Sequence, residues 1–588
     1  MKKVLIFLSL VLMILIGPIG CKSSKVTYTE DDYKRLNAVI HHVENILKYG
    51  RRYNPDTQLL PDAINTLTGE PAKWVFPNRA TVPYANLANQ QNFFRTLVAL
   101  STVTGNSKYK EQAVATLSEF MKNYQDPNGL FYWGGHRMIN LDTLEVQSTE
   151  GPNGPHELKN MMPYYELMYE VDPDATLRFM RQLWTAHYEW DTSDLNRHGS
   201  YSTAYDTNVF GGKIPEDIIK LGTNGRPIIP EDSPGKLPFV NSATDLSYAA
   251  LTLAEYTYDP SPKDWARYLM KQYNLASDPA TGMTVYQFKS TLITKSPQEC
   301  SDPAYTNSGC GDRARRQFRD FGEIAREANI AWKNTQAIYV DNILMLVESG
   351  RKYNIPEFIE WAKQYLEGYL KYAYIRVNGT NKIIPMFIDG TVTYGYVFPE
   401  VGYYGPSNTP LDYVEMPTTY ILPILRTILN LEKDEDKVVL WNYLRDIMYS
   451  FNIGDIGELG GKKPSLNLDT SIDDPFALMA LVELYNATKN IDYLNVARTI
   501  GNNIVKERFH RGFFVENEIL LYSRLDQPDT LALLILDGVI KGYKLDEMPF
   551  YLADSGYIHG YLLADDGVVE DRNYSHRIIY TKTIYDWE

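Results

Sequence analysis

Three side chains in the first third of the sequence have the chemistry to bind a divalent metal ion. His136 lies in the segment YWGGHRM, Glu157 in PHELKN and His198 in LNRHGS, each beside a predicted turn. Two imidazoles and one carboxylate leave coordination positions open, which water or substrate oxygens can fill. The spacing matches no local metal-binding motif, so it indicates this site only weakly. A single histidine in a loop is more often a structural residue than a ligand.

Cationic and aromatic residues near these three have the chemistry to bind an acidic substrate or to move a proton. Three cations are close in sequence, as substrate-binding candidates or as surface charges: Arg79, Arg137 and Lys159. Arg197 directly precedes His198 and can clamp a carboxylate through its planar guanidinium. Tyr201 and Tyr205 follow, and a phenol beside a metal titrates lower than usual and can exchange a proton. Stacking against sugar or protein accounts for both tyrosines equally well.

The order of these residues resembles the signature of family 2 polysaccharide lyases, the pectate disaccharide-lyases, which fold as α/α toroids. The resemblance covers the sequence around His136, Glu157 and the adjacent Arg197-His198 pair. It implies that His136, Glu157 and His198 hold a divalent metal ion, typically manganese in that family. It also implies that Arg197 is the catalytic base and that the substrate is an acidic polysaccharide. Related toroidal families that cleave glucuronan or alginate are the neighbouring expectation.

These residue types suit β-elimination from a uronate. The proton that leaves is beside a carboxylate, so that carboxylate must first be neutralised. A metal ion can do this as a Lewis acid, and cationic side chains can share the task. The identity of the base stays open on the residues alone, because a guanidinium is almost never deprotonated in proteins. Arg197 is the base that the resemblance favours, and Tyr201 or Tyr205 is the alternative.

Two other functions compete with the lyase. Paired carboxylates at the starts of predicted helices are the acid and base of inverting glycosidases on toroids, although helix capping explains them as well. The acidic residues in question are Asp473, Asp474, Asp526 and Asp529. A non-catalytic glycan-binding lipoprotein is the third interpretation, and it needs no set of two histidines, a glutamate and an arginine.

The first residues have the pattern of an exported lipoprotein. Lys2 and Lys3 precede an apolar run that is short for a membrane span, and a cysteine follows at Cys21. We expect residues 1–21 to be a lipoprotein signal peptide and residues 22–30 to be a tether. The protein would then be anchored to a membrane by lipid, facing the periplasm or the cell exterior.

Charge and cysteine content restrict the partners and the compartment. The net charge of −15 argues against nucleic acid, because no basic block offsets it. An acidic protein that binds acidic glycans also needs a locally basic cleft. Cys300 and Cys310 lie in a turn-rich stretch, where a disulfide would close a short loop in an oxidising compartment.

Amphipathic helices must position these side chains, since apolar residues recur at three- and four-residue spacing along most of the chain. We expect helices near residues 31–49, 90–104, 108–123, 158–171, 173–188, 245–258, 262–276, 335–352, 355–371, 414–432, 435–451, 474–488, 490–506 and 528–542. Short strands are expected in residues 383–404 and after Tyr551, where polar and β-branched or aromatic residues alternate.

Two stretches of the sequence are versions of one unit. Each begins with a helix, at Leu97 or Leu481, and continues through a tight turn and a second helix into a loop with glycine and aromatic residues. A weaker copy begins at Leu251. Repeated helical hairpins bury their apolar faces against their neighbours and leave loops at a rim for binding. We therefore expect an all-α-dominated fold, an α/α toroid of about seven hairpins, closed or open, as a single domain over residues 31–588. A stacked solenoid is the competing architecture.

Overall fold

Helices form most of the protein, as a computed structural model shows. The structure describes residues 26–75, 81–149, 154–189, 194–229, 237–289, 293–296, 298–301, 310–553, 557–563, 569–575, 580 and 583–584. Arg79, the expected signal peptide and residues 22–25 of the expected tether lie outside the described residues.

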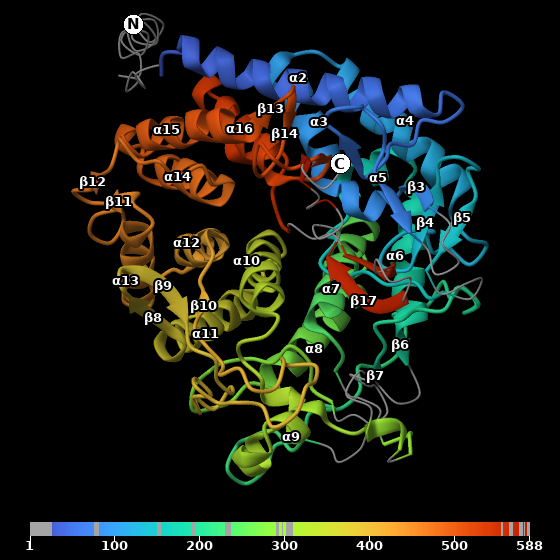
Figure 1. Cartoon of the computed structure of the whole chain (residues 1–588), viewed down its shortest axis with the longest axis vertical. Coiled ribbons are helices and arrows are strands. Elements are labelled where there is room, and N and C mark those ends of the chain that lie inside the picture. Colours follow the sequence, from blue (N-terminus) through green and yellow to red (C-terminus); the bar gives the residue numbers. More distant parts are fainter. Residues whose placement is uncertain are drawn as a thin grey trace, which may run out of the picture.

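Two concentric sets of helices form a ring (Figure 1). The inner helices are α3 (Gln91–Thr104), α5 (Tyr165–Val171), α7 (Val240–Thr257), α10 (Asn342–Lys352), α12 (Ile421–Asn430), α14 (Pro475–Thr488) and α16 (Pro528–Lys541). The outer helices are α2 (Glu30–Tyr53), α4 (Lys108–Asn123), α6 (Pro173–His187), α8 (Ser261–Leu275), α11 (Pro356–Tyr372), α13 (Asp434–Ser450) and α15 (Ile491–Arg508). Each inner helix pairs with an outer helix to form a hairpin.

The two sets differ in burial, and the sequence explains why. In α16 every residue from Pro528 to Ile540 is buried, because this helix is apolar on nearly all sides. The outer helix α6 buries one face, with Phe179, Leu183 and Trp184 inside. A helix that is apolar all round must be enclosed, whereas an amphipathic helix covers a core with one stripe. Hydrophobic patterning therefore separates the inner layer from the outer one.

Neighbouring inner helices contact one another all the way round the ring. The series runs from α3 to α16, α14, α12, α10 and α7. The remaining step passes through α5, where the ring centroids of Tyr165 and Tyr248 of α7 lie 5.5 Å apart. On the other side of α5, the backbone amide of Tyr164 donates to Gln91 of α3. Because α2 packs against α15 and α16, the first helix completes the last hairpin. The described chain is thus a closed toroid of seven hairpins, and the solenoid alternative is wrong.

Most helix boundaries follow local signals that the sequence carries. Asp172 and Asp474 cap α6 and α14 with their side chains, each directly before a proline in the first turn. Two predicted helices begin later than expected. Residues 158–164 form a loop, in which Asn160 and Met162 have positive φ, and the helix begins only at Tyr165. The predicted helix at 414–432 begins at Ile421, after a short 3-10 turn.

The predicted repeat is present in the structure. The first copy is α3 and α4 followed by a β-bridge between Gln125 and Phe131. The second is α14 and α15 followed by the hairpin of β13 (Phe509–His510) and β14 (Phe513–Phe514). In the third, α7 and α8 lead to a turn in which the amide of Asp278 donates to the carbonyl of Met283. Each unit thus sends a tight loop to the same rim.

Short antiparallel strands decorate this ring, as expected, but not all in the expected places. A four-stranded sheet has the order β2 (Lys73–Val75), β3 (Thr81–Ala85), β4 (Arg137–Asn140), β5 (Val146–Ser148). The other sheets are β1 (Ala63–Asn65) with β15 (Tyr522–Arg524), β8 (Tyr374–Val377) with β9 (Thr380–Ile383) and β10 (Val414–Glu415), β6 (Tyr188–Glu189) with β7 (Asp194–Leu195), β11 (Gly454–Asp455) with β12 (Ser465–Leu466), and β16 (Tyr557–Leu563) with β17 (Val569–Ser575). The strands expected after Tyr551 are confirmed. Residues 384–404 contribute only isolated bridges.

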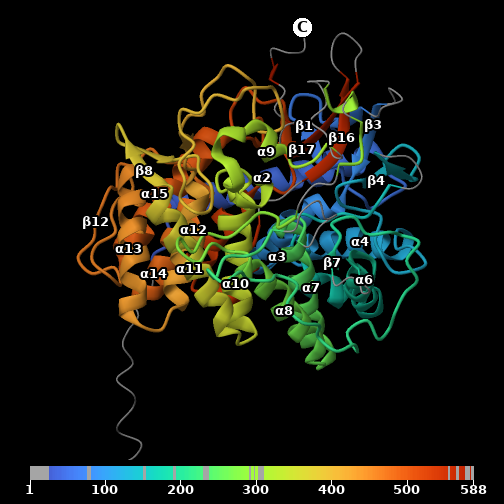
Figure 2. The ribbon, with the colours of Figure 1, turned by 90° about the horizontal axis from the view of Figure 1, so that it is seen from below.

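The two rims of the toroid differ in their elements. We call the rim where the inner helices begin the N-rim, and the rim where they end the C-rim. The sheets gather at the N-rim (Figure 2). The segment after α16 leaves the C-rim and runs inside the ring, where Arg426 of α12 donates to the carbonyl of Tyr551 and Asn92 of α3 donates to the carbonyl of Ala553. It leads to β16, which contacts β2.

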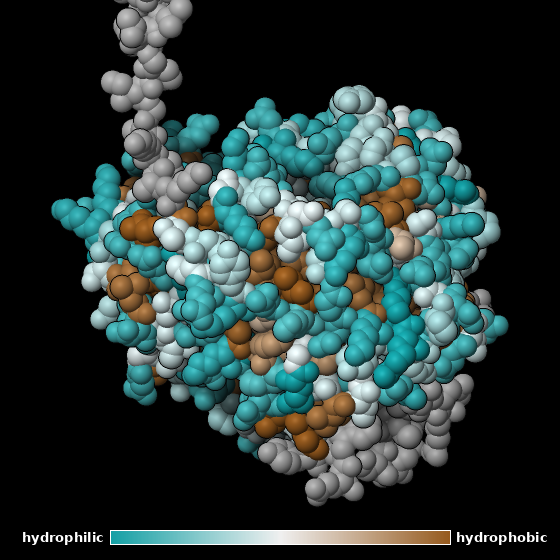
Figure 3. Space-filling model, turned by 90° about the horizontal axis from the view of Figure 1, so that it is seen from above, coloured by the Kyte–Doolittle hydropathy of each residue, from teal (hydrophilic) through white to brown (hydrophobic). Residues whose placement is uncertain are grey.

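Polar groups dominate the outer face that carries α2, with scattered apolar patches (Figure 3). This follows from the amphipathic outer helices, which in α2 turn Val39, Val43 and Ile46 inward. No helix among the described residues is long and apolar enough to cross a membrane. Cys300 and Cys310 are joined in a disulfide, as the sequence suggested.

We predict that Ile46→Ala lowers the free energy of unfolding by about 2 to 5 kcal/mol, because it leaves a cavity where α2 closes the ring. Ile46 is fully buried. Chemical denaturation measures the change, with the exposed Lys48→Ala on the same helix as the control. Equal stability of the two variants would contradict the closure of the ring through α2.

Candidate metal-binding and catalytic site

Backbone pairing brings together the three side chains that sequence separates. Gly134 pairs with Glu157, and the amide of Gly135 donates to the carbonyl of Glu157 at 2.8 Å. His156 pairs with Gly199 through two amide-to-carbonyl bonds, both 2.8 Å. These bridges lie within two residues of His136, Glu157 and His198. Three loops of the N-rim are therefore fastened side by side.

The predicted ligand atoms converge. One nitrogen from each histidine and one oxygen of Glu157 all lie within 4.8 Å of one another. Nε2 of His136 lies 3.2 Å from Glu157 Oε2, and Nε2 of His198 lies 3.5 Å from Oε1. The two rings stand at 85° to each other. His136 and Glu157 are fully buried, whereas the side chain of His198 is 31% exposed, so the cluster opens on the His198 side.

Two cations hold the Glu157 carboxylate in its ionised form. Lys159 Nζ lies 3.0 Å and Arg197 Nε lies 3.5 Å from Glu157 Oε1. Burial by itself would raise the pKa of Glu157, but the positive charge of Lys159, the hydrogen bond from His136 and the charge of Arg197 lower it well below its usual value. Burial lowers the pKa of Lys159 to about 8, against the attraction of Glu157. The carboxylate is thus a permanent negative charge inside the protein.

This donor set fits a divalent metal ion. Burial lowers the pKa of His198, so its imidazole is neutral and keeps a lone pair for a metal. An ionised carboxylate and two imidazoles suit Mn²⁺ and similar ions and leave open positions for exchangeable ligands. In the structure, Arg197 Nε donates to Nε2 of His198 at 3.1 Å. A metal at that nitrogen would take the same lone pair, and Arg197 would need another acceptor.

A pair of histidines beneath the site was missed by the sequence reasoning. His187 Nδ1 donates to the carbonyl of Asn196 at 2.9 Å, and the amide of Asn196 donates back to the carbonyl of His187 at 2.7 Å. Burial lowers the pKa of His187 to about 4, so its Nε2 is an acceptor, and His156 Nδ1 donates to it at 2.9 Å. Four of the nine histidines therefore meet here, which their clustering in the sequence could have indicated. This pair fixes the loop that presents Arg197 and His198.

Arg137 and Tyr201 form one wall of an adjoining cavity of about 530 Å³, which His198 also lines. Arg137 Nε donates to the carbonyl of Gly154 at 2.9 Å, and its guanidinium lies 4.9 Å from the Tyr201 ring centroid. The Tyr201 hydroxyl donates to the carbonyl of Phe131 at 2.9 Å. Burial raises the pKa of Tyr201 well above its usual value. Tyr205 lies under the guanidinium of Arg178 of α6, which gives its ring a structural contact.

On the other side, aromatic rings and cations continue from Arg197. The guanidinium of Arg197 lies 4.7 Å from the Phe239 ring centroid, and Phe239 stacks on Tyr286 at 4.6 Å. Burial and the nearby Tyr403 raise the pKa of Tyr286, and Arg197 opposes this rise. Tyr403 in turn lies against two cations that the sequence reasoning missed: Arg313, at 3.8 Å, and Lys333, at 3.4 Å. The basic run RARRQFR that begins at Arg313 was the available signal.

These cations give the N-rim the locally basic surface that an acidic protein needs to bind an acidic glycan. Lys159, Arg197, Arg313 and Lys333 follow the aromatic row at the N-rim, and Arg137 lines the adjoining cavity. Arg313 is held by Glu327, with 2.5 Å between Nε and Oε1. Charges fixed at a partly buried surface act at short range, where the net charge of the whole protein counts for less.

The carboxylates that supported a hydrolase are engaged in the structure. Asp474 Oδ1 accepts from the amides of Phe476 and Ala477, both at 2.9 Å, and so caps α14. Arg508 binds Asp473 at 2.8 Å and Asp529 at 3.2 Å. Asp526 pairs with Arg524. The capping interpretation of Asp474 is confirmed, and the arginine-bound carboxylates have structural partners.

The two sequence comparisons agree on one family. The sequence matches the family described as periplasmic pectate lyase over residues 57–561. A protein of Dickeya dadantii (strain 3937) described as a pectate disaccharide-lyase is 36% identical over 528 residues, which cover 89% of this chain and 92% of that protein. Among solved structures, cellobiose 2-epimerases from Bacillus thermoamylovorans B4167 and Spirochaeta thermophila DSM 6192 align with TM-scores of 0.41 and 0.40, at 10% and 11% identity. Each alignment covers 87% of this chain and 98% of the epimerase.

We predict that Gly134→Ala lowers the affinity for Mn²⁺ at least tenfold. Gly134 has φ +95°, and a Cβ there would lie 2.2 Å from the carbonyl oxygen of Glu157, so the bridge that joins two ligand loops must shift. Calorimetric titration measures the affinity. The control is Gly212→Ala, because a Cβ at Gly212 meets nothing within 4 Å. Unchanged affinity in Gly134→Ala would show that the bridge does not set the ligand geometry.

We also predict that His187→Ala weakens Mn²⁺ binding by about 10- to 100-fold, the usual effect of removing a partner behind metal ligands. The reason is that the Asn196 carbonyl and His156 lose their common partner. His187→Gln should recover part of the affinity, since an amide can still donate to Asn196. The exposed His41→Ala is the control, and equal affinities for His187→Ala and His41→Ala would refute the positioning role.

Proposed function

This chain belongs to the periplasmic pectate lyase family and is therefore a polysaccharide lyase, and from this premise we propose that it cleaves pectate by β-elimination at the His136, Glu157 and His198 cluster. The observation that carries the proposal is the convergence of these three ligand atoms within 4.8 Å. The adjacent guanidinium of Arg197 supplies the second requirement, a group able to exchange a proton. Pectate is the substrate that the relative's description prints.

The reaction needs the substrate carboxylate to be neutralised. A divalent ion bound by His136, Glu157 and His198 would supply Lewis-acid stabilisation of the negative charge that develops on this carboxylate. Lys159 adds positive charge on the same side, and Arg137 binds the chain through the adjoining cavity. The proton beside the carboxylate then goes to the base, its electron pair forms a carbon–carbon double bond, and the glycosidic carbon–oxygen bond breaks. The base returns this proton, directly or through water, to the leaving oxygen, so the products are an unsaturated uronate end and a new hydroxyl.

Arg197 is the best-placed base. Its side chain is 28% exposed, beside the one ligand that is open to solvent, His198. Lys159 and a bound dication both disfavour a protonated guanidinium and so assist proton acceptance. Tyr201 is less suitable, because its hydroxyl donates to the Phe131 carbonyl and burial raises its pKa. Tyr205 lies against Arg178. We therefore assign the proton transfer to Arg197 and stacking roles to the tyrosines.

Three further assignments belong to this proposal. The resident ion is Mn²⁺, because nitrogen and carboxylate ligands with open positions suit it. The family is described as periplasmic, which supports export of the chain. Cleavage of the signal peptide before Cys21 and lipidation of Cys21 would anchor the protein to a membrane through the tether of residues 22–30, with residues 31–588 as one toroidal domain. The substrate, an acidic polysaccharide, would then meet the N-rim.

We predict that a chelator abolishes the ultraviolet absorbance that an unsaturated uronate produces from pectate, and that Mn²⁺ restores it. Arg197→Lys should lower kcat about 10²- to 10⁴-fold while Mn²⁺ affinity stays within threefold, because the ligand set is intact. Arg267→Lys, a half-exposed arginine on α8, is the control. Full activity in the chelator, or an Arg197→Lys enzyme as fast as Arg267→Lys, would overturn the mechanism. New reducing ends without this absorbance would indicate a hydrolase.

A further inference from the structure

A second cavity lies at the C-rim, away from the metal-binding loops of the N-rim. Its volume is about 630 Å³, which is within the range of sites that bury a small ligand. The final turns of α10, α12 and α14 and residues 544–551 line it. The inner helices begin at the N-rim, where the metal-binding loops are, and end here, so the two sites occupy opposite rims of the toroid.

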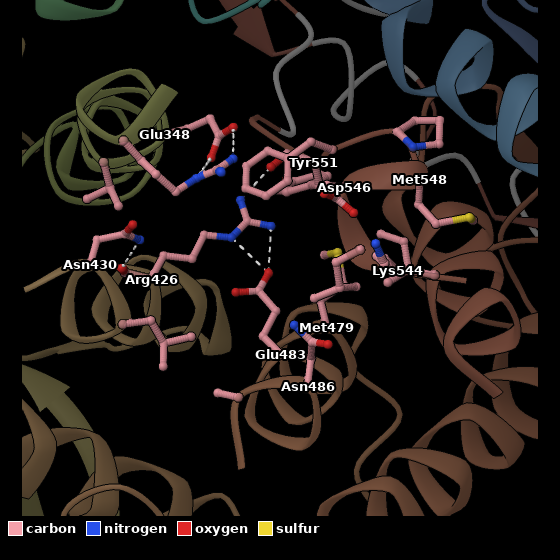
Figure 4. Close-up of a pocket in the computed structure, with 18 of the residues that line it drawn as sticks. Glu348, Arg426, Asn430, Met479, Glu483, Asn486, Lys544, Asp546, Met548 and Tyr551 are labelled. Carbon is pink, nitrogen blue, oxygen red and sulfur yellow. Dashed lines mark hydrogen bonds and ion pairs between the residues drawn. The ribbon is translucent and has the colours of Figure 1, made fainter. Parts of the chain in front are cut away.

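The centre of this cavity is a fixed ion pair (Figure 4). Arg426 is 5% exposed and donates through Nε to Glu483 Oε1 at 2.9 Å and through its NH1 group to the Tyr551 carbonyl at 2.6 Å. Its guanidinium lies 3.7 Å from the Phe550 ring centroid. These contacts hold the polar groups in place before any ligand arrives, which lowers the entropy cost of binding.

The mouth of the cavity is positively charged, although the protein as a whole is acidic. Arg351 has a side chain that is 53% exposed, and Lys489 and Lys544 are also exposed. Glu348 binds Arg351 at 2.6 Å, and Asp546 is the other acidic residue at the mouth. Exposed cations around a concave, half-open pocket attract anionic groups.

The lining also carries the groups that bind sugars. Two amides, Asn430 and Asn486, lie beside the ion pair, and amide, carboxylate and guanidinium groups can each make paired hydrogen bonds with neighbouring hydroxyls. Apolar side chains cover the remaining wall, where the C–H face of a sugar ring can pack: Leu429, Met479, Ile535 and Met548. The combination of paired polar groups, apolar wall and cationic mouth matches one class of ligand.

We propose that this C-rim cavity is a second, non-catalytic binding site for a short acidic oligosaccharide, of about the size of a uronate disaccharide. The identity of the ligand rests on the proposed function, because β-elimination of pectate releases such molecules. The cavity itself exists independently of that reaction. Residues 544–551, which form one wall, continue through the ring to β16 at the N-rim, so a ligand here contacts the same segment that reaches the sheet beside Arg137.

Calorimetric titration of digalacturonate into the full chain loaded with Mn²⁺ tests the proposal. We expect two binding events in the unaltered protein and one in each of two variants. Leu429→Trp fills the cavity from a side chain that is 39% exposed, and Lys544→Glu reverses a charge at the mouth. Lys463→Glu, at a lysine that is 86% exposed elsewhere, is the matched control and should keep both events.

Both variants should keep the lyase activity of the unaltered protein within twofold, which also shows that they fold. A single event in the unaltered protein, or two events in both variants, would overturn the proposal. Equal binding of the neutral disaccharide cellobiose at the C-rim would overturn the assignment to acidic sugars. If the unaltered protein shows no lyase activity on pectate but still binds digalacturonate at the C-rim, only the proposed function would be contradicted.

Discussion

The burial of the Glu157 carboxylate is the constraint on which the N-rim depends. Burying a charged carboxylate away from water costs free energy unless cations and hydrogen-bond donors surround it. Lys159, Arg197 and the two histidines supply this surrounding. The same arrangement keeps the carboxylate ionised and the His198 imidazole neutral, which is the state that a metal requires. A bound dication would add positive charge beside this carboxylate.

The toroid helps to meet this constraint because its helices fix where the loops of the N-rim begin and end. The inner helices all begin at one rim, so loops from different hairpins meet there. Bridges from Gly134 to Glu157 and from His156 to Gly199 then fix the loops to one another. His187 at the end of α6 holds the third loop from below. Local backbone pairing thus brings residues that are distant in sequence together in one site.

Much of the fold could be predicted from the sequence, because apolar periodicity and capping residues act locally. Helix existence and the repeat followed from such signals. The loop at 158–164 could not, since the positive φ of Asn160 and Met162 depends on tertiary contacts, including the Met162 amide bonded to Asp245. The metal ligands were predicted because their order along the chain resembles the signature of a known family. Their spacing alone would not have identified them. Lys333 was missed because its partner, Tyr403, comes from a remote loop.

Anomalous X-ray scattering from crystals grown with Mn²⁺ would test the central claim most directly. The account predicts one strong anomalous peak within bonding distance of a nitrogen of His136, a nitrogen of His198 and a carboxylate oxygen of Glu157, with the Arg197 guanidinium beside it. A peak held by other residues, or the absence of a peak in crystals of a protein whose activity responds to chelator, would contradict it.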